Sequence, residues 1–280
     1  DLTPDDGPTA YTIRAERTPQ EWCAAVAEAT RRLHAGEARK VVLARAVEVT
    51  TDRPLRAGAV LSQLRRAYPA SHLFSTGGFV GATPELLVAR SGDRVQAHPM
   101  AGTAPRSGDP STDARLAASL LASRNTLDEH RHTIDMVHDT LLPWCSYLDE
   151  EAEPSIVTMA NVQHLATRLD GRLSSPAASV LELVTALHPT PAVGGAPRGV
   201  ALQLIAELEQ LDRGLYAGPV GWVDAAGNGT WAVGIRSAQL DGTTARLFAG
   251  VGVVADSDPA SELAETRAKM QAVLGALVRP

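Results

Sequence analysis

Hydrophobic and polar positions along this chain follow two periods, one typical of helices and one typical of strands. Residues 18–21 (TPQE) have the form of a capping box with proline at the first helical position, so we predict a helix that ends near Gly36. Residues 39–50 (RKVVLARAVEVT) alternate and are rich in valine, which predicts a strand. A second helix is expected at about 55–67. The chain therefore opens with helix, strand and helix.

Short extended segments follow these elements. Residues 71–76, 79–91 and 94–102 read as strands, and glycine-containing turns at 77–78 and 92–93 separate them. Their short connections favour antiparallel pairing, because two neighbouring antiparallel strands need only a tight turn between them.

The central region predicts helices around a further extended segment. Residues 111–142 are expected to form two helices that meet around Asn125. Residues 155–173 read as a strand pair or a long ribbon. Two more helices, at about 176–187 and 197–210, flank the loop HPTPAVGG.

The last third of the chain predicts three strands and a terminal helix. The strands are 218–225, 229–240 and 245–254, joined by hairpin turns that contain glycine. The helix begins at Asp258-Pro259. Helices and antiparallel hairpins are interspersed without strict βαβ alternation, so the pattern predicts an α+β fold. With no repeat or linker, we expect a flexible segment at 1–17 and one catalytic domain at 18–280.

Composition narrows the class of protein. The 280 residues are 44% hydrophobic and 21% charged, which is an ordinary globular balance. A net charge of −6 argues against a nucleic-acid surface. Two isolated cysteines, Cys23 and Cys145, fit a reducing compartment. No signal peptide or long apolar span is seen, so we expect a cytoplasmic protein without membrane partners.

The terminal helix places two carboxylates and an ammonium on one face. Glu262 and Glu265 are three residues apart, and Lys269 follows Glu265 after four. The preceding segment, RLFAGVGVV, reads as a buried strand that ends in small residues. Such a junction can hold a divalent cation beside a carboxylate ligand. The alternative is an ordinary glutamate–lysine pair on a solvated helix face.

Two further residues suit acid–base chemistry. Lys40 stands at the start of an apolar strand, where desolvation favours the neutral amine and lets it act as a base. Glu85 follows Pro84 and enters a buried strand, so it is a candidate general acid. The alternatives are a lysine whose ammonium reaches solvent past the strand end, and an ordinary surface glutamate.

The helix around residues 128–141 carries Glu129 beside three histidines. His130, His132 and His138 raise the question of zinc, but no cysteine or HExxH pattern joins them. Glu129 is better suited as an oxygen ligand of magnesium. His164, flanked by apolar residues, reads either as a satisfied core histidine or as part of a site.

Anion-binding groups come from a strand and from two loops. Arg236 lies in a predicted strand of small and apolar residues, and its planar guanidinium suits a carboxylate. The loops at 101–103 and 192–195 offer backbone N–H groups to anions. Neither loop matches a P-loop or a dinucleotide-binding fingerprint.

Taken in order, these segments resemble the chorismate-utilising enzymes, with isochorismate synthases as the nearest likeness. The resemblance runs from about residue 18 to 277. Its motifs are KVVLAR, GATPELL, HPMAGT, EH at 129–130, QHLAT, HPTPAVGG, IAELEQLDRGLYAGPVGW, IRSAQL, FAGVGVV and SELAETRAKM. It implies the chorismate-binding fold, also found in anthranilate synthase component I, with antiparallel sheets flanked by helices.

The resemblance also implies a role for each matching residue. Lys40 resembles the base that activates water for attack on C2 of chorismate, and Glu85 the acid that protonates the departing C4 hydroxyl. Mg²⁺ would be held by Glu129 and Glu265 with Glu262 nearby. The residues that resemble the family's substrate contacts are Gly102, Thr103, His164, Ala192, Val193, Arg236, Gly250 and Lys269.

The sequence therefore predicts a Mg²⁺-dependent isochorismate synthase, an isomerase that interconverts chorismate and isochorismate without an organic cofactor. Its product would serve menaquinone, catechol siderophore or salicylate formation. Rivals are a salicylate synthase, which releases pyruvate, an ammonia-using anthranilate or aminodeoxychorismate synthase component, and a non-catalytic scaffold. Lys40 speaks against the ammonia users, which typically lack it. We expect a monomer without an obligatory glutaminase partner.

Two departures from the family pattern qualify these expectations. Thr126 stands where family members often have an acidic residue, three positions before Glu129. Family members also usually have a further N-terminal segment that contributes strands to the core. If such strands are lacking, exposed sheet edges predict poor stability or association.

Overall fold

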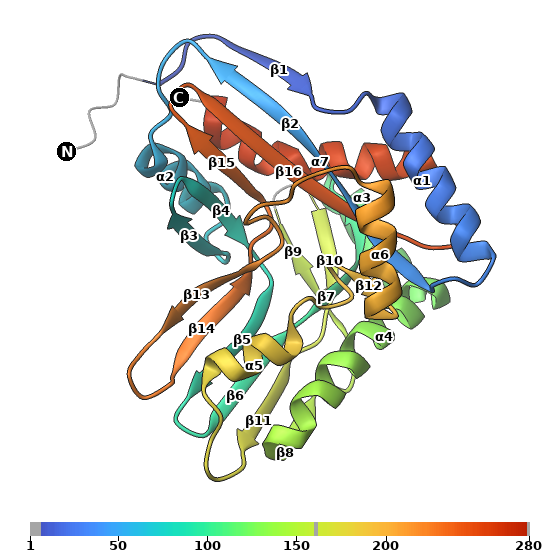
Figure 1. The fold of residues 1–280 in the computed structure, drawn as a ribbon, viewed down its shortest axis with the longest axis vertical. Coiled ribbons are helices and arrows are strands. Elements are labelled where there is room, and N and C mark those ends of the chain that lie inside the picture. Colours follow the sequence, from blue (N-terminus) through green and yellow to red (C-terminus); the bar gives the residue numbers. More distant parts are fainter. Residues whose placement is uncertain (1–6, 160–161, 279–280) are drawn as a thin grey trace. The chain divides into compact units, whose positions relative to one another are not determined.

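A computed structural model describes residues 7–159 and 162–278, and its contacts divide the chain into two compact units (Figure 1). One unit, here called the first unit, is formed by the chain up to Thr83, by Val193–Ala217 and by the chain from Gly234 onward. The second unit is formed by Pro84–Ala192 and Gly218–Val233. The chain leaves and re-enters each unit, so no single linker marks a boundary within the region expected to be one domain.

The first unit is built on a seven-stranded antiparallel sheet in the order β1-β2-β16-β15-β4-β3, with β12 also paired to β2. The longest pairing joins β16 to β2, from Thr244 opposite Thr50 to Val253 opposite Val41. The strands are β1 (Tyr11–Ala15), β2 (Lys40–Thr51), β3 (His72–Thr76), β4 (Phe79–Thr83), β12 (Gly195–Ala196), β15 (Ser237–Asp241) and β16 (Thr244–Val253). The helices are α1 (Pro19–His34), α2 (Ala57–Ala67), α6 (Arg198–Leu208) and α7 (Pro259–Val278).

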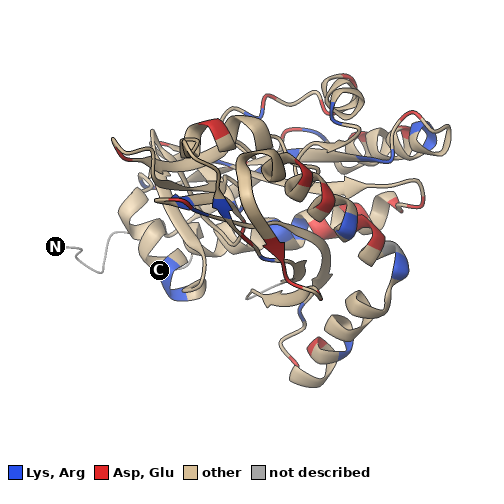
Figure 2. Cartoon of the chain, turned by 90° about the horizontal axis from the view of Figure 1, so that it is seen from below, with Lys and Arg blue, Asp and Glu red and all other residues tan. Residues whose placement is uncertain are grey.

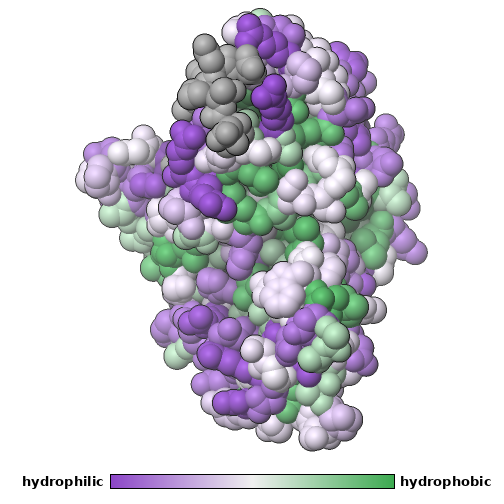
Figure 3. All heavy atoms as spheres, turned by 90° about the vertical axis from the view of Figure 1, so that its left-hand side faces the viewer, coloured by the Kyte–Doolittle hydropathy of each residue, from purple (hydrophilic) through white to green (hydrophobic). Residues whose placement is uncertain are grey.

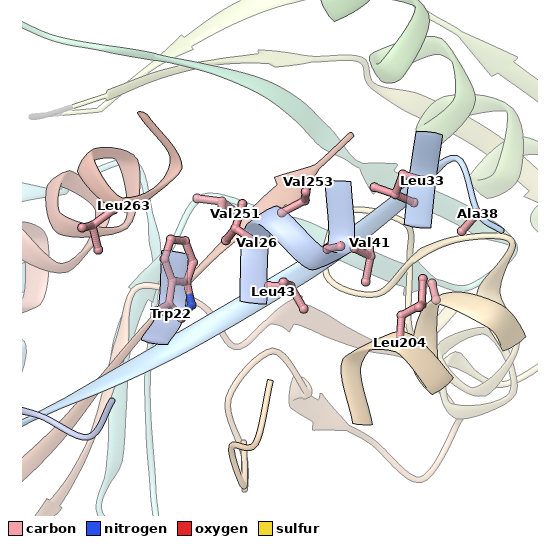
Figure 4. Close-up of a cluster of buried hydrophobic side chains, with 12 residues drawn as sticks. Trp22, Val26, Leu33, Ala38, Val41, Leu43, Leu204, Val251, Val253 and Leu263 are labelled. Carbon is pink, nitrogen blue, oxygen red and sulfur yellow. The ribbon is translucent and has the colours of Figure 1, made fainter. Parts of the chain in front are cut away.

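Helix α1 starts where the sequence predicts. The Thr18 hydroxyl accepts from the Glu21 backbone N–H at 3.2 Å, and the Glu21 carboxylate accepts from the Thr18 N–H at 2.8 Å. The buried face of α1 covers β2 and β16, and α6 and α7 add to the same core (Figure 4). This cluster comprises Trp22, Val26, Ala29, Leu33, Ala38, Val41, Leu43, Ala201, Leu204, Val251, Val253 and Leu263.

The second unit contains a six-stranded and a three-stranded antiparallel sheet. Their orders are β13-β14-β5-β6-β11-β8 and β7-β10-β9. The strands are β5 (Leu86–Ser91), β6 (Arg94–His98), β7 (Met100–Pro105), β8 (Cys145–Glu150), β9 (Ser155–Thr158), β10 (Val162–Ala166), β11 (Leu169–Leu173), β13 (Pro219–Val223) and β14 (Gly229–Val233). The helices are α3 (Pro110–Ala122), α4 (Arg124–Leu141), a short 3-10 turn (Leu142–Trp144) and α5 (Val180–Leu187).

Mixed helices and antiparallel sheets confirm the predicted α+β class, but several details differ from the sequence prediction. The expected strand 229–240 is two strands, β14 and β15, which belong to different sheets. The region 155–173 gives three strands, not one pair, with 160–161 outside the described residues. Strand β8 was not predicted at all.

The expectation of a flexible segment at 1–17 is wrong for β1. This strand pairs with β2 from Tyr11 opposite Thr51 to Ala15 opposite Val47. Within the part of 1–17 that the structure describes, five residues are therefore fixed by a backbone ladder.

Charged residues of both signs are interspersed over the elements (Figure 2), in keeping with the small net charge of −6. The face drawn in Figure 3 likewise mixes hydrophilic and apolar residues. Large apolar side chains are exposed on outer strands of the sheets, among them Tyr11 and Ile13 of β1 and Trp222 of β13. None of the described helices is both long and apolar enough to cross a membrane.

Candidate active site

Lys40 is the first residue of β2, and its side chain is buried, with 8% of the residue exposed. On one side Val41 pairs with Val253 of β16, and on the other Lys40 lies opposite Ala196 of β12. The alternative of a lysine that extends into solvent is therefore wrong. β12 thus pairs with Lys40 itself, and β16 pairs with the residue that follows it.

Gly195 makes the approach of β12 to Lys40 possible. Its φ is +134°, and a Cβ at this position would lie 2.3 Å from the Lys40 carbonyl oxygen and 2.9 Å from the Val41 Cα. A side chain here would collide with backbone that cannot move aside. The HPTPAVGG loop therefore needs glycine in order to pair with the strand that carries Lys40.

The sequence predicts a strand at Arg236, and this prediction is wrong. Arg236 occupies the connection between β14 and β15 and has a φ of +52°, which is uncommon for a residue with a side chain. The residue is 5% exposed, and its Nη1 lies 3.4 Å from the Lys269 carbonyl oxygen, to which it donates. The interruption between β14 and β15 thus turns the buried guanidinium of Arg236 toward α7.

Lys269 connects α7 to β16. Its Nζ donates to the Gly250 carbonyl oxygen at 2.9 Å and forms an ion pair with Glu265 Oε1 at 2.6 Å. The predicted alignment of Glu265 and Lys269 on one helix face is confirmed. Glu262 lies one turn earlier and is half-buried. Arg236, Gly250, Glu265 and Lys269 therefore form a connected group within the first unit.

Tyr216 joins this group and was not singled out from the sequence. Its ring stacks on Phe248, with ring centroids 5.1 Å apart. Burial raises the pKa of the Tyr216 hydroxyl to about 12, although nearby Arg213 and Arg236 and a hydrogen bond with the Gly250 backbone act in the opposite direction. The hydroxyl therefore stays protonated near neutral pH and can donate. The signal for it was present in the motif IAELEQLDRGLYAGPVGW.

In the second unit, Glu85 lies between β4 and β5 and is 4% exposed. Its backbone carbonyl accepts from the Val233 N–H at 3.1 Å, which ties this turn to β14. The surface interpretation of Glu85 is therefore wrong, and so is its placement on a strand. A carboxyl group in this position is shielded from water, as a general acid requires.

Thr103 and His164 form a side-chain pair across neighbouring strands of the second unit. Thr103 Oγ1 lies 3.1 Å from His164 Nδ1, and β7 and β10 pair their backbones at these two residues. Gly102 has a φ of +84°, and a Cβ on it would lie 2.6 Å from the Thr126 methyl group. The threonine that departs from the family pattern thus packs directly against the Gly102–Thr103 segment.

Glu129 lies on α4 and is half-buried, while the adjacent His130 is buried and its Nε2 lies 2.8 Å from Thr167 Oγ1. No group of three His, Cys, Asp or Glu side chains that could hold a metal ion occurs among the residues the structure describes. This holds for the histidines of α4 and for the three glutamates predicted to bind magnesium alike. For Mg²⁺, the oxygen donors of Glu129, Glu262 and Glu265 are of the right chemical kind, and Glu262 and Glu265 share one helix face.

The predicted site residues thus fall into two sets. The set in the first unit is Lys40, Val193, Arg236, Gly250, Glu262, Glu265 and Lys269, and the set in the second is Glu85, Gly102, Thr103, Glu129, His164 and Ala192. Each set contains one of the two predicted acid–base groups.

Comparison with known proteins gives a consistent result. Residues 3–278 match the family model described as chorismate binding enzyme. The chain is 48% identical over 255 residues to the putative isochorismate synthase MenF of Mycobacterium tuberculosis, covering 86% of this chain and 68% of that protein. It is 38% identical over 278 residues to the isochorismate synthase DhbC of Bacillus subtilis, covering 95% of this chain and 70% of that protein.

Solved structures agree with these matches. A crystal structure of the putative 2,3-dihydroxybenzoate-specific isochorismate synthase DhbC from Bacillus anthracis superposes with a TM-score of 0.92 at 36% identity, covering 96% of this chain and 74% of that one. Anthranilate synthase component I from Streptococcus pneumoniae superposes with a TM-score of 0.83 at 25% identity, covering 98% of this chain and 62% of that one. The fold, the order of motifs and the family match lead to one conclusion: the chain belongs to the chorismate binding enzymes.

Proposed function

We propose that this protein is a Mg²⁺-dependent isochorismate synthase, which interconverts chorismate and isochorismate. The observation that carries the proposal is Lys40, a lysine buried at the start of β2, where β12 pairs with it and β16 pairs with the next residue. A buried amine of this kind is suited to activate water, which the isomerase needs and an ammonia-using relative does not. The isochorismate synthases among the similar proteins support the same reaction.

In the proposed reaction the Lys40 amine takes a proton from a water molecule whose oxygen bonds to C2 of chorismate. The ring double bonds shift, the bond from C4 to its hydroxyl oxygen breaks, and Glu85 donates a proton to the departing oxygen. One water enters and one leaves, so the net change is movement of a hydroxyl group. Lys40 ends protonated and Glu85 ionised, and exchange with solvent restores both.

The substrate is a dianion, so its two carboxylates need cationic partners. We assign Arg236 and Lys269 to this task, because Lys269 donates to the Gly250 carbonyl and Arg236 donates to the Lys269 carbonyl, and because Arg236 is buried and the Lys269 side chain is only 16% exposed. Glu262 and Glu265, which share one face of α7, would hold Mg²⁺, which when bound supplies positive charge to a substrate carboxylate. Thr103 with His164, and Ala192 with Val193, would line the ring.

The test is to incubate the purified protein with chorismate and Mg²⁺ and to separate the products by chromatography. Isochorismate alone, and none after EDTA is added, is the expected result. Salicylate with pyruvate would replace the proposal by a salicylate synthase. Product formed only when ammonia is supplied would replace it by an aminating synthase component, and no turnover by a folded sample would refute an enzymatic role.

A further inference from the structure

Strand β2 has an outer edge that two strands cover only in part. β12 pairs with it at Lys40 and Val41, and β1 pairs with it from Val47 to Thr51. Between these stretches no strand of the described chain lies on this edge. Buried backbone groups need hydrogen-bond partners, so the groups of Val42, Ala44 and Ala46 that face this edge must find them elsewhere.

A carboxylate and a guanidinium supply part of what a strand would supply here, beside Trp22 Nε1, which donates to the Ala44 carbonyl at 3.3 Å, and the Glu16 N–H, which donates to the Ala46 carbonyl at 3.2 Å. Glu209 Oε2 accepts from the Ala44 N–H at 2.8 Å, and Arg213 Nη2 donates to the Val42 carbonyl at 2.8 Å. The two side chains bind each other through Nε to Oε1 at 2.7 Å and Nη2 to Oε2 at 2.6 Å. The pair therefore supplies one acceptor and one donor at the spacing of a strand ladder.

The same guanidinium also holds the loop next to Lys40. Arg213 Nη1 donates to the Val193 carbonyl at 2.9 Å, while the Gly194 carbonyl accepts from the Val42 N–H at 2.9 Å. Two residues later β12 pairs with β2 at Lys40. One planar group thus fixes β2 and the HPTPAVGG loop relative to each other on the side where Lys40 begins the strand.

Stability alone does not account for a charged pair at this position. Glu209 is 2% exposed and follows the last residue of α6, where the helix dipole disfavours a negative charge. Buried ion pairs often contribute little net stability, because desolvation offsets their attraction. Burial disfavours the charged form of Arg213, but its contacts with Glu209 outweigh this and raise the pKa of the guanidinium. What the pair provides is directed hydrogen bonding.

We infer that Glu209 and Arg213 are positioning residues, which set the placement of Lys40 by locking β12 and β2 in register. The inference rests on the proposed function, in which Lys40 is the base. The inference predicts that a substitution of Arg213 that keeps its positive charge but loses its forked geometry displaces the Lys40 amine from the water that it activates. A displacement of about 1 Å lowers the rate of such a step by roughly 10²-fold.

The variant that tests this is Arg213→Lys, assayed for isochorismate formation. A single ammonium cannot make four directed contacts, so we expect turnover to fall by about 10–100-fold with a much smaller change in KM. The matched control is Arg94→Lys in the second unit, where an exposed arginine makes a bidentate pair with Asp170 at 2.9 and 3.0 Å. The control should keep wild-type turnover.

A double-mutant cycle with Lys40→Ala separates positioning from general destabilisation. If Arg213 acts through Lys40, Arg213→Lys should cost little further activity once Lys40 is gone. An equal loss in both backgrounds would overturn the inference. If Lys40→Ala alone keeps full turnover, the proposed base is wrong and the inference falls with it, which the single variant reveals. Should Arg213→Lys fail to fold, Glu209→Gln takes its place in the cycle and keeps the shape of the pair.

Discussion

Gly195→Ala tests how closely β12 must approach the strand that carries Lys40. In the structure a Cβ at Gly195 would lie 2.3 Å from the Lys40 carbonyl oxygen, 2.8 Å from the Ala201 Cβ and 2.9 Å from the Val41 Cα. Two of these three atoms belong to the backbone of a central strand and the third to a buried helical alanine. The added methyl group therefore displaces β12 and lengthens the hydrogen bond from the Arg39 N–H to the Ala196 carbonyl, now 2.8 Å.

Two physical terms set the size of the effect. A residue with a side chain at a φ of +134° is strained, at a cost of about 1–3 kcal/mol. Inserting a methyl group into a closely packed region costs a further ~1–3 kcal/mol. The sum, about 2–6 kcal/mol, is a large part of the ~5–15 kcal/mol by which a typical domain is stable. We expect a folded but weakened protein, or failure to fold at the upper end.

Urea unfolding followed by circular dichroism measures the loss, and turnover of chorismate in the same preparation measures the displacement of Lys40. Gly199→Ala is the matched control, because Gly199 lies in α6 and a Cβ there would meet nothing within 4 Å. This control should unfold at the wild-type urea concentration or slightly above it. Wild-type stability and turnover in Gly195→Ala would refute the claim that β12 needs glycine at this approach.

Three further predictions follow from single contacts or charges. Lys40→Ala should lower turnover by about 10²–10⁴-fold with an unchanged circular dichroism spectrum, the usual weight of one acid–base group, and wild-type turnover would exclude Lys40 as the base. Glu265→Gln should raise the Mg²⁺ concentration needed for half-maximal activity, and an unchanged Mg²⁺ titration would remove Glu265 from the metal site. Hydrogen bonds from Thr9 and Ala10 lower the pKa of Asp52 to about 2, so the stability it contributes is complete above its unfolded pKa of about 4 and is lost as the pH falls through 2. Asp52→Asn should therefore lose less stability than wild type between pH 4 and 2 in urea titrations, and equal losses would contradict this.

Local signals in the sequence were sufficient for the elements whose ends depend on neighbouring residues. The capping box at 18–21 fixes the start of α1 through its own side chains. The valine-rich segment 39–50 predicts β2 because β-branched residues pack well in a strand, and the structure buries both faces of this one. The capping contacts of α1 lie within the same four residues that predict it, whereas β2 is predicted by a local pattern although its ladder partner β16 is distant in sequence.

The break at Arg236 could not be predicted in the same way. From 229 to 240 the sequence contains no proline, asparagine or aspartate, and an internal glycine such as Gly234 marks a bulge within a strand as readily as the end of one, yet β14 and β15 belong to different sheets. The positive φ of Arg236 arises from the tertiary structure on either side of it, not from a local preference of arginine. Strand β8 was missed because its residues are half-buried or exposed and show little alternation.

The candidate site likewise contains residues that could be found from the sequence and residues that could not. Lys40, Glu85 and Arg236 were found from the sequence because each charged residue stands among apolar neighbours, and all three are buried. The Glu209–Arg213 pair was not found from the sequence, because a glutamate and an arginine four residues apart are typical of an ordinary pair on a helix surface. Only the structure shows that their partners are backbone groups of β2 and the Val193 carbonyl.

Lys269 leads to one further prediction, because its ammonium is paired with Glu265, a carboxylate that the proposed metal site requires. At 2.6 Å from Glu265 Oε1 it neutralises this oxygen, and it is also the proposed partner of a substrate carboxylate. When substrate draws Lys269 away, Glu265 becomes a better ligand, so chorismate and Mg²⁺ should strengthen each other's binding by the same factor.

Lys269→Gln removes the competing charge, and we expect Mg²⁺ alone to bind about 2–5-fold more tightly, the range for a partly exposed ion pair. The gain in Mg²⁺ affinity that chorismate brings should shrink in the variant, and turnover should fall. Calorimetric titration of Mg²⁺ with and without chorismate measures both quantities, and weaker Mg²⁺ binding by Lys269→Gln in the absence of chorismate would show that Lys269 does not compete with the metal.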